Sequence, residues 1–318
     1  MRSVVSILIV PVLAAATWTY EGQWGGGVFY SPGALAVAPA NGYVYVADPM
    51  WDRVTYFTPA GSLLGSWGGY GTGNGQLFMP GGVAVAPATG YIYVSDSYNY
   101  RVQYFTPAGS FLGKWGSEGT GDGEFYMPRA IAVAPATGYV YVNDYSTNNN
   151  RVQYFTAAGS FLGKWGSTGT GDGQLRYPSG ITVKPATGTV YVSEALNHRV
   201  QYFTPVGSFL GKWGEYGVGD GQFKNPEGIA VSADGGIIFV VDCTNDRVQY
   251  FTPGGSFLGK WGQYGYGDGE FVFPSDVDLT PAGTRAYVAD TDNHRVQYFT
   301  SDEAVTPASL GRIKALFK

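Results

Sequence analysis

Apolar runs and turn residues alternate along the chain, and residues 80–115 show the pattern once in full. Four short runs rich in Val, Ile, Tyr and Phe are separated by turns or loops, at residues 83–86, 91–96, 101–105 and 110–115. The second run, Tyr-Ile-Tyr-Val-Ser-Asp, places aromatic side chains on one face of a strand and aliphatic ones on the other, because side chains alternate along a strand. A strand that is apolar on both faces is buried on both. The pattern therefore predicts four-stranded antiparallel sheets whose two faces are both covered.

The same pattern recurs at a nearly constant interval. Its third run opens on an Arg-Val pair whose arginines are 48, 50, 48, 48 and 48 residues apart: Arg53, Arg101, Arg151, Arg199, Arg247 and Arg295. A proline, which is tolerated at the first residue of a strand, opens each first run: Pro32, Pro80, Pro128, Pro178, Pro226 and Pro274. Repetition of one sequence pattern at a fixed interval indicates a repeat architecture, and it is stronger evidence for the fold than any single local motif. The chain is therefore predicted to hold six copies of one four-stranded unit in a single domain.

Such units either stack in a line or close into a ring, the β-propeller. The two ends of the repeat array favour the ring. The last copy lacks a fourth run after Thr300, whereas residues 19–24, Thr-Tyr-Glu-Gly-Gln-Trp, resemble the fourth run at 110–115 but precede the first complete copy. We therefore predict an all-β, six-bladed β-propeller of four-stranded antiparallel blades over residues 17–300, closed by an N-terminal strand that completes the last blade.

Composition agrees with this fold and narrows the choice of partner. The 318 residues include 49 Gly, 25 Tyr, 18 Phe and 8 Trp, which suits an all-β chain with many turns. Only 14% are charged, the formal net charge is -5, and no basic run occurs. Nucleic-acid binding relies on a basic surface, so we expect no nucleic-acid partner.

The N-terminal residues 1–16 are typical of a secretory signal. Arg2 precedes an apolar stretch at residues 4–13 and the small residues Ala14-Ala15-Ala16. The stretch is short for a membrane span. We expect a secreted or periplasmic monomer without a membrane span; a loose apolar terminus is the alternative. Cys243 is the only cysteine, which excludes an intrachain disulfide and a thiol metal cluster.

The C-terminal tail, residues 301–318, lies outside the repeats. Thr306 and Pro307 suit the start of a short helix, and Leu310, Ile313 and Leu316 would lie near one face of it. A helix loosely packed on the ring and a tail that docks a partner or directs sorting are both compatible with this pattern.

Three phrases together resemble the NHL-repeat family: Gly-Asp-Gly-Gln-Phe at 219–223, Pro-Glu-Gly-Ile-Ala-Val at 226–231 and Asn-His-Arg-Val at 197–200. All six copies carry the resemblance, from about Thr17 to Thr300. It implies a propeller, often of six blades, that serves as a binding platform for proteins and, in basic members, RNA. Related propellers include an amidating lyase with a histidine-bound metal and calcium-dependent lactonases. This chain has only two histidines, His198 and His294, so a three-histidine metal site cannot form.

Acidic residues end the second run of every copy: Asp48, Asp96, Asp144, Glu194, Asp242 and Asp290. A ring of six carboxylates could bind calcium, which prefers oxygen ligands. Each acid recurs with the arginine of its own copy, however, and an ion pair or a set of loop hydrogen bonds inside each blade explains this more simply. The sequence therefore favours no metal and no cofactor, with calcium at these six acids as the alternative.

Specificity should reside where the copies differ. Trp51 stands in a loop that is small and polar in the other copies, and the loop at residues 145–150 is two residues longer than its equivalents. The residue that follows the strand-start proline also differs in charge between copies, as Arg129 after Pro128 and Glu227 after Pro226 show. The predicted ligand-binding residues are Trp51, Arg129, Tyr145, Asn148 and Asn149.

No residue set stands apart from the repeat as catalytic machinery would, so the sequence favours a non-enzyme. We expect a binding or scaffold propeller that recognises a protein or glycan through one rim. A calcium-dependent hydrolase or lyase with a carboxylate site in the central channel is the alternative. A structural cell-surface repeat without a ligand is a third possibility.

Overall fold

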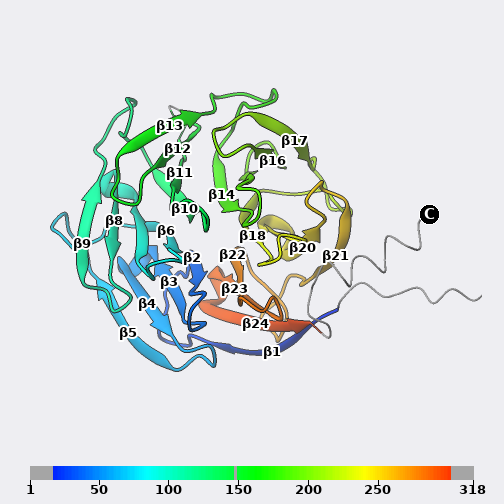
Figure 1. The fold of residues 1–318 in the computed structure, drawn as a ribbon. Coiled ribbons are helices and arrows are strands. Elements are labelled where there is room, and N and C mark those ends of the chain that lie inside the picture. Colours follow the sequence, from blue (N-terminus) through cyan, green and yellow to red (C-terminus); the bar gives the residue numbers. More distant parts are fainter. Residues whose placement is uncertain (1–16, 147–148, 302–318) are drawn as a thin grey trace, which may run out of the picture.

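Six four-stranded antiparallel sheets surround a central axis in the computed structural model, which describes residues 17–146 and 149–301 (Figure 1). The predicted all-β six-bladed propeller is confirmed. From the axis outward, blade 1 contains β2 (Ala34–Val37), β3 (Val44–Asp48), β4 (Arg53–Phe57) and β5 (Leu63–Gly68), and blade 2 contains β6 (Pro80–Val85), β7 (Ile92–Asp96), β8 (Arg101–Phe105) and β9 (Phe111–Trp115). Blade 3 contains β10 (Pro128–Val133), β11 (Val140–Asp144), β12 (Arg151–Phe155) and β13 (Phe161–Trp165), and blade 4 contains β14 (Pro178–Val183), β15 (Val190–Glu194), β16 (Arg199–Phe203) and β17 (Phe209–Trp213). Blade 5 contains β18 (Pro226–Val231), β19 (Ile238–Asp242), β20 (Arg247–Phe251) and β21 (Phe257–Trp261).

Blade 6 combines the two ends of the array, as predicted. Its inner strands are β22 (Pro274–Leu279), β23 (Arg285–Asp290) and β24 (Arg295–Ser301), and its outer strand is β1 (Trp18–Trp24). β1 pairs antiparallel with β24, so that Trp18 lies opposite Ser301 and Trp24 opposite Val296. Figure 1 shows β1 beside β24 at the outer edge of the ring. The closing strand therefore joins the first residues of the propeller to its last.

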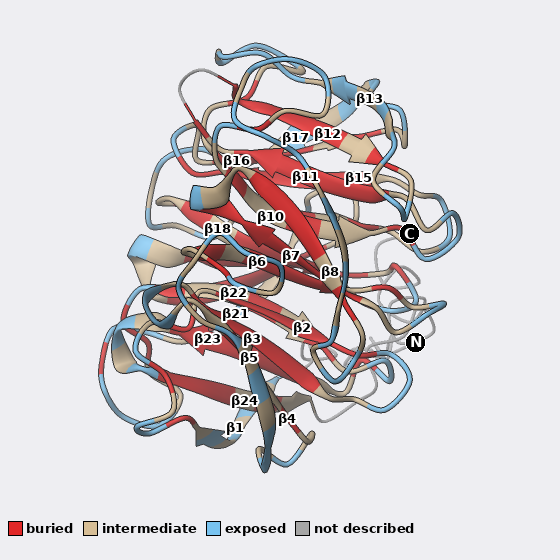
Figure 2. Cartoon of the chain, turned by 90° about the vertical axis from the view of Figure 1, so that its left-hand side faces the viewer, coloured by how far each residue is buried: buried red, intermediate tan, exposed pale blue. Residues whose placement is uncertain are grey.

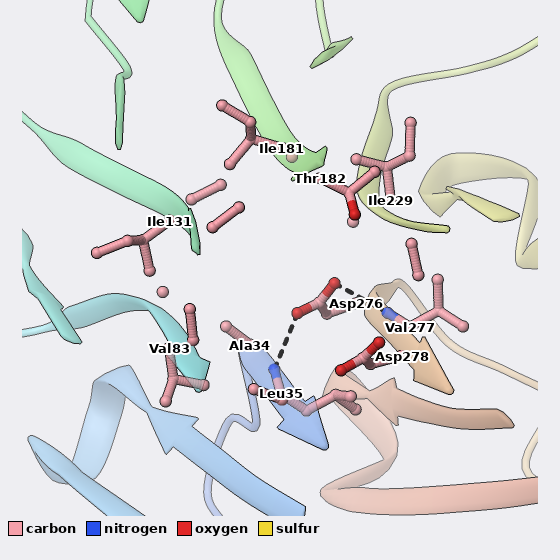
Figure 3. Close-up of a pocket in the computed structure, with 18 of the residues that line it drawn as sticks. Ala34, Leu35, Val83, Ile131, Ile181, Thr182, Ile229, Asp276, Val277 and Asp278 are labelled. Carbon is pink, nitrogen blue, oxygen red and sulfur yellow. Dashed lines mark hydrogen bonds between the residues drawn. The ribbon is translucent and has the colours of Figure 1, made fainter. Parts of the chain in front are cut away.

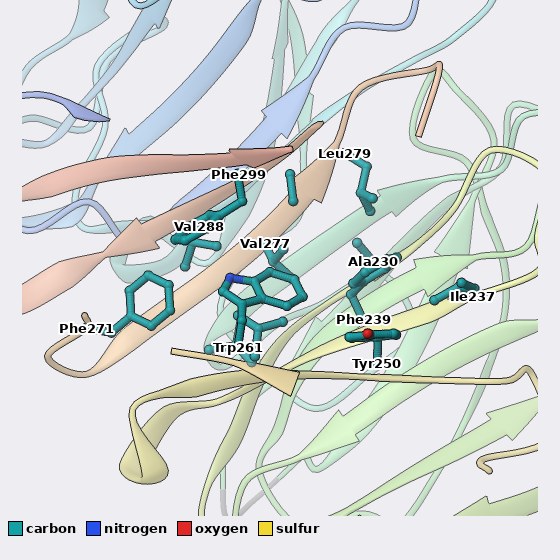
Figure 4. Packing of buried hydrophobic residues seen from close by; sticks show 13 residues of the cluster. Ala230, Ile237, Phe239, Tyr250, Trp261, Phe271, Val277, Leu279, Val288 and Phe299 are labelled. Carbon is teal, nitrogen blue, oxygen red and sulfur yellow. The ribbon is translucent and has the colours of Figure 1, made fainter. Parts of the chain in front are cut away.

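The hydrophobic core is divided among the six junctions between neighbouring blades. Each junction holds its own cluster of buried side chains. In the junction between blades 5 and 6, Trp261 packs between Phe239 and Phe299, with centroid separations of 6.0 and 5.7 Å (Figure 4). Trp18 of β1 stacks on the same Trp261 at 5.2 Å. Both faces of each sheet are apolar because each contributes to a different cluster.

In five of the six junctions, a tryptophan near the end of the outer strand also lies against a glycine of the next blade. In the junction between blades 5 and 6, Trp261 lies against Trp18 instead. Gly159, in the turn before β13, has φ +89° and lies directly over the Trp115 ring, where a Cβ would overlap the ring carbons. Glycine is needed there both for the left-handed backbone and for the close approach. This contact accounts for the Gly-Ser pair that precedes each outer strand from blade 1 to blade 5.

Successive strands reverse direction, so loops of one kind all emerge on the same side of the ring. The loop face carries the loops between the second and third strands and the connections between blades: residues 25–33, 49–52, 69–79, 97–100, 116–127, 145–146, 149–150, 166–177, 195–198, 214–225, 243–246, 262–273 and 291–294. Four of these loops contain a short 3-10 helix: η1 (Pro49–Trp51), η2 (Ser97–Asn99), η3 (Cys243–Asn245) and η4 (Thr291–Asn293). The turn face carries the short turns between the other strands. Figure 2 shows buried residues along the strands and exposed residues at both faces.

The predicted signal at residues 1–16 and nearly all of the predicted tail, residues 302–318, lie outside the described residues. Over the part of the chain that is described, no helix is both long enough and apolar enough to cross a membrane.

Candidate functional site

A cavity of about 350 Å³ lies on the axis and is lined by the six innermost strands (Figure 3). Small residues dominate its wall because the strands crowd together there. A Cβ at Gly82 would overlap the backbone oxygen of Arg129, and one at Gly180 would overlap the backbone oxygen of Glu227. Close approach of neighbouring backbones thus requires glycine at these positions.

Two aspartates of β22 are exceptions in this wall. Asp276 accepts the N–H of Leu35 at 2.9 Å, and Asp278 accepts the N–H of Val37 at 2.8 Å. The second oxygen of each carboxyl accepts the N–H of the following residue, at 2.9 and 2.8 Å. Figure 3 shows Asp276 reaching from β22 toward β2. The two carboxyls therefore bridge the junction between the last blade and the first.

Burial raises the pKa of Asp276 to about 8 and that of Asp278 to about 6, although their backbone N–H bonds favour the ionised form. The folded protein then holds protons that the unfolded chain has released. These carboxyls stabilise the fold fully below about pH 4, and their contribution is lost as the pH rises through 6 and 8. We expect the unfolding free energy of the wild type to fall more steeply from pH 4.5 to 8.5 than that of Asp276→Asn/Asp278→Asn. Urea titrations across this range measure both slopes.

The other buried carboxyls are present in both proteins, so their contributions to the pH dependence of the unfolding free energy cancel when the two slopes are compared. Parallel pH profiles would show that the two aspartates do not retain protons in the folded state.

An ion pair spans the mouth of the cavity on the loop face. Arg129 of β10 and Glu227 of β18 meet with an Nη2–Oε2 distance of 2.8 Å, across the strand β14 that lies between theirs. The Arg129 guanidinium also lies 4.4 Å from the ring centre of Tyr145. Burial raises the pKa of Glu227, and Arg129 partly offsets this effect. The six-fold repetition is broken here, because the equivalent positions in the other blades are glycine or serine.

Cys243 lies near this ion pair and is partly buried. Burial, followed by the negative charge of Glu227, raises the pKa of its thiol. The thiol is therefore protonated at neutral pH, which makes it a poor nucleophile.

The structure brings together two of the predicted ligand-binding residues, Arg129 and Tyr145, while Trp51 lies on the same face in blade 1. Asn148 lies outside the described residues. Asn149 is buried, and its amide donates to Asp144 at 2.6 Å and to the Gly119 carbonyl at 2.9 Å. That places Asn149 in the framework of its blade.

The six acids that end the second strands are fully buried and lie in six separate networks. In blade 4, Glu194 accepts hydrogen bonds from Arg199 Nε at 2.6 Å, from Asn197 Nδ2 at 2.5 Å and from Gln201 Nε2 at 2.8 Å. It also accepts the backbone N–H of Arg176 in the preceding connection. Asp96, Asp242 and Asp290 have the same types of partner. Asp144 accepts from Arg151, Asn149 and backbone N–H groups of the preceding connection. These acids hold each loop to its blade and do not converge on the channel.

Blade 1 departs from this scheme. Trp51 occupies the position at which the other blades have an asparagine that donates to the acid. Arg53 lies 4.3 Å from the Trp51 ring centre and donates to the Val28 carbonyl at 2.8 Å. Its buried Nε has no hydrogen-bond partner among the described residues. Asp48 instead accepts two backbone N–H groups of the preceding connection.

The two histidines join neighbouring blades. His198 has φ +52°, and its Nδ1 accepts the backbone N–H of Asn225 at 3.2 Å. Burial lowers the pKa of His198, which favours the neutral ring required for this bond. Asp52, Asn150 and Asp246 accept the equivalent backbone N–H with their side-chain oxygens. The histidine is thus one of several residues that can fill a structural position.

Within residues 17–146 and 149–301, no three His, Cys, Asp or Glu side chains are grouped closely enough to hold a metal ion. The six predicted acids and the two aspartates of the cavity form no such group. Their carboxyl oxygens are taken up by N–H donors of the blades.

Aromatic side chains are concentrated on the loop face. Every exposed Tyr, Trp or Phe of the described chain lies there: Tyr30, Trp51, Tyr70, Tyr98, Tyr126, Tyr216, Tyr264, Tyr266 and Phe273. The other exposed large apolar residues of the described chain are not aromatic: Val206 in a turn of the turn face, Leu63, Leu64, Leu112, Leu162 and Leu210 on outer strands, and Met50, Leu196 and Val218 on the loop face. Among the described residues, exposed aromatic rings are therefore confined to the loop face.

The aromatic rings form at least one pair at each blade junction, and six of these are called the aromatic pairs below; Phe78 also lies 5.1 Å from Tyr98. The ring centroids of the six pairs are 4.8 to 6.3 Å apart: Tyr30–His294, Tyr70–Phe78, Tyr100–Tyr126, Tyr145–Tyr177, His198–Tyr216 and Tyr264–Tyr266. The loop face therefore repeats a similar surface feature around the axis.

Comparison with known proteins agrees with this architecture. A family model for the NHL repeat matches residues 223–251. Among solved structures, a candidate gluconolactonase is 15% identical with a TM-score of 0.63 and coverage of 91% of this chain and 93% of that one. A gluconolactonase of Xanthomonas campestris is 14% identical, with a TM-score of 0.63 and 86% coverage of both chains. The hydrazine synthase of Kuenenia stuttgartiensis is 12% identical, with a TM-score of 0.62 and coverage of 86% and 96%. The sequence matches no curated protein. At these identities the structural likeness concerns the fold alone.

Proposed function

We propose that this six-bladed NHL-repeat propeller is a non-catalytic binding protein whose loop face takes a protein or glycan ligand. The observation that carries the proposal is the restriction of exposed aromatic rings to that face. Exposed rings are unfavourable in water, and they supply contact area at low entropic cost when a ligand covers them. The ion pair of Arg129 and Glu227 marks the one place at the cavity mouth where the blades differ in charge. We include secretion or periplasmic location and a monomeric state in this proposal, as the sequence predicts.

The alternative function, a calcium-dependent hydrolase or lyase, has less support. It would need oxygen ligands that converge in the cavity. Three carboxyl groups line the cavity. All four oxygens of Asp276 and Asp278 already accept a backbone N–H, and Glu227 is paired with Arg129 at 2.8 Å. A melting curve recorded with calcium and with a chelator separates the two functions, because a resident calcium would raise the melting temperature by mass action.

A binding comparison tests the role of the loop face. Wild type, Tyr70→Ala/Tyr216→Ala and the turn-face control Val206→Ala are immobilised and exposed to the extracellular fraction of the producing organism. We expect the wild type and the control to retain the same protein or glycan, and the double variant to retain at least about fivefold less, because both tyrosines are exposed. Circular dichroism checks that all three are folded. Equal retention by the double variant, or no retained ligand, would contradict the proposal.

A further inference from the structure

We propose that the aromatic pairs of the loop face bind a neutral polysaccharide, with a sugar subsite at each junction where the rings are open to solvent. The inference rests on the proposed binding function and names its ligand class. Tyr264–Tyr266 and Tyr30–His294 are the pairs in which both residues are exposed.

The geometry of the Tyr264–Tyr266 pair suits a sugar ring. The two rings are inclined at 72° with centroids 6.0 Å apart, and their hydroxyl oxygens are 3.3 Å apart. The side chains are 62% and 70% exposed, so their ring faces are free to receive a ligand. A pyranose presents a face of C–H groups, which carry partial positive charge and pack on the negative face of an aromatic ring.

Polar side chains border the same rings. Gln263 donates to Glu270 at 3.0 Å, and the Glu270 carboxylate also accepts the N–H of Gly267, beside Tyr266. The negative charge of Asp246 acts on Tyr264. Carboxylate and amide groups beside an exposed ring can accept and donate the hydrogen bonds of sugar hydroxyls. The junction therefore combines an apolar surface with hydrogen-bonding groups at its edge.

Charge favours a neutral ligand. The Gly-Asp-Gly turns of the loop face carry carboxylates, and the lysines that face three of them are paired at 2.6 Å: Lys164–Asp122, Lys212–Asp172 and Lys260–Asp220. The fourth, Asp268, lies near Tyr20, and burial together with this carboxylate raises the pKa of Tyr20 to about 12. The net charge of -5 disfavours a polyanion. Two of the aromatic pairs carry a cation, since Arg129 lies 4.4 Å from the ring centre of Tyr145 and Lys224 5.7 Å from that of Tyr216.

The spacing of the aromatic pairs favours a polysaccharide over a protein. Neighbouring pairs lie at successive blade junctions with a blade between them, so the apolar surface is divided around the ring. A protein interface typically concentrates its energy in one packed central cluster. Separate weak subsites gain affinity when a ligand with repeated units occupies several of them together. A polymer of like sugars has such units.

Affinity electrophoresis tests the proposal. Folded protein is run in native gels containing graded amounts of neutral α- and β-linked glucans, mannan, galactan or soluble chitin oligosaccharides, with pectate as the polyanion. We expect at least one neutral polysaccharide to retard the wild type, and its monosaccharide to compete weakly. Tyr264→Ala/Tyr266→Ala should bind about fivefold or more weakly, whereas Tyr264→Phe/Tyr266→Phe, which keeps the rings, and Val206→Ala should bind nearly as the wild type does.

Several outcomes would overturn the inference. They are retardation by pectate alone, no retardation by any neutral polysaccharide, or equal retardation of the double alanine variant. If the loop face retains a protein in the binding comparison but no polysaccharide retards it, the proposed function stands and this inference fails. If neither a protein nor a glycan binds, both fail.

Discussion

A chain that begins at Gly25, and so lacks the closing strand β1, is expected to melt at least about 10 °C below the wild type. Two tryptophans are lost: Trp18, which stacks on Trp261, and Trp24, which packs against Tyr287 and Phe57. Removing a buried Trp side chain costs about 3–5 kcal/mol, and each kcal/mol lowers the melting temperature of a chain of 150–250 residues by about 2–4 °C. The edge of β24 would also be left without a partner.

The matched control removes residues 302–318. All four strands of blade 6 lie within residues 18–301, so this truncation should leave the melting temperature within about 2 °C of the wild type. Circular dichroism at one heating rate compares the three proteins. Equal melting temperatures for the two truncations would contradict a ring closed by β1.

Arg199→Ala is expected to lower the unfolding free energy by about 3–5 kcal/mol, because it leaves a buried carboxylate without its cation. Glu194 is fully buried, and the Arg199 side chain is 8% exposed. Arg199 also donates to three backbone carbonyls of the preceding connection, at 2.7 to 2.9 Å. Its loss therefore loosens the connection as well as the ion pair. Urea unfolding followed by tryptophan fluorescence measures the change.

Arg53→Ala provides the comparison within the same protein. In blade 1 the arginine forms no ion pair, since Arg53 instead contacts the Trp51 ring and the Val28 carbonyl. We expect a loss of about 1–2 kcal/mol for these two interactions. A loss as large as that of Arg199→Ala would mean that the ion pair is not what stabilises the other blades.

The propeller could be predicted because its determinants are local and repeated. Turn residues, paired strands and strand-start prolines recur with one period, and the incomplete ends at Trp24 and Thr300 complement each other. The pairing of each acid with its arginine was predictable for the same reason, since both residues belong to one blade. It holds in five of the six blades, and the sequence gives a sign of the exception, because Trp51 replaces the asparagine found at that position elsewhere.

The features of the cavity were harder to predict. Arg129 and Glu227 belong to different blades, and their contact depends on how closely the inner strands approach across the ring. The sequence showed only that the charge varies at these positions. Asp276 and Asp278 were missed, although aligning the six copies places them where the others mostly have glycine or alanine. The longer loop predicts Asn149 as a ligand residue, and the structure places it at the asparagine position that the other blades use to bind their acid.

The pairing of β1 with β24 also determines which face of the ring points away from a support or fusion partner that is joined next to either strand. β24 runs from the loop face to the turn face, and β1 is antiparallel to it, so Trp18 and Ser301 lie together on the turn-face side. A fusion partner, surface support or anchor joined at either residue would therefore be attached on the turn-face side of the ring. The aromatic pairs, which lie on the loop face, would point away from the attachment. Attachment at Trp18 or Ser301 thus presents the loop face outward.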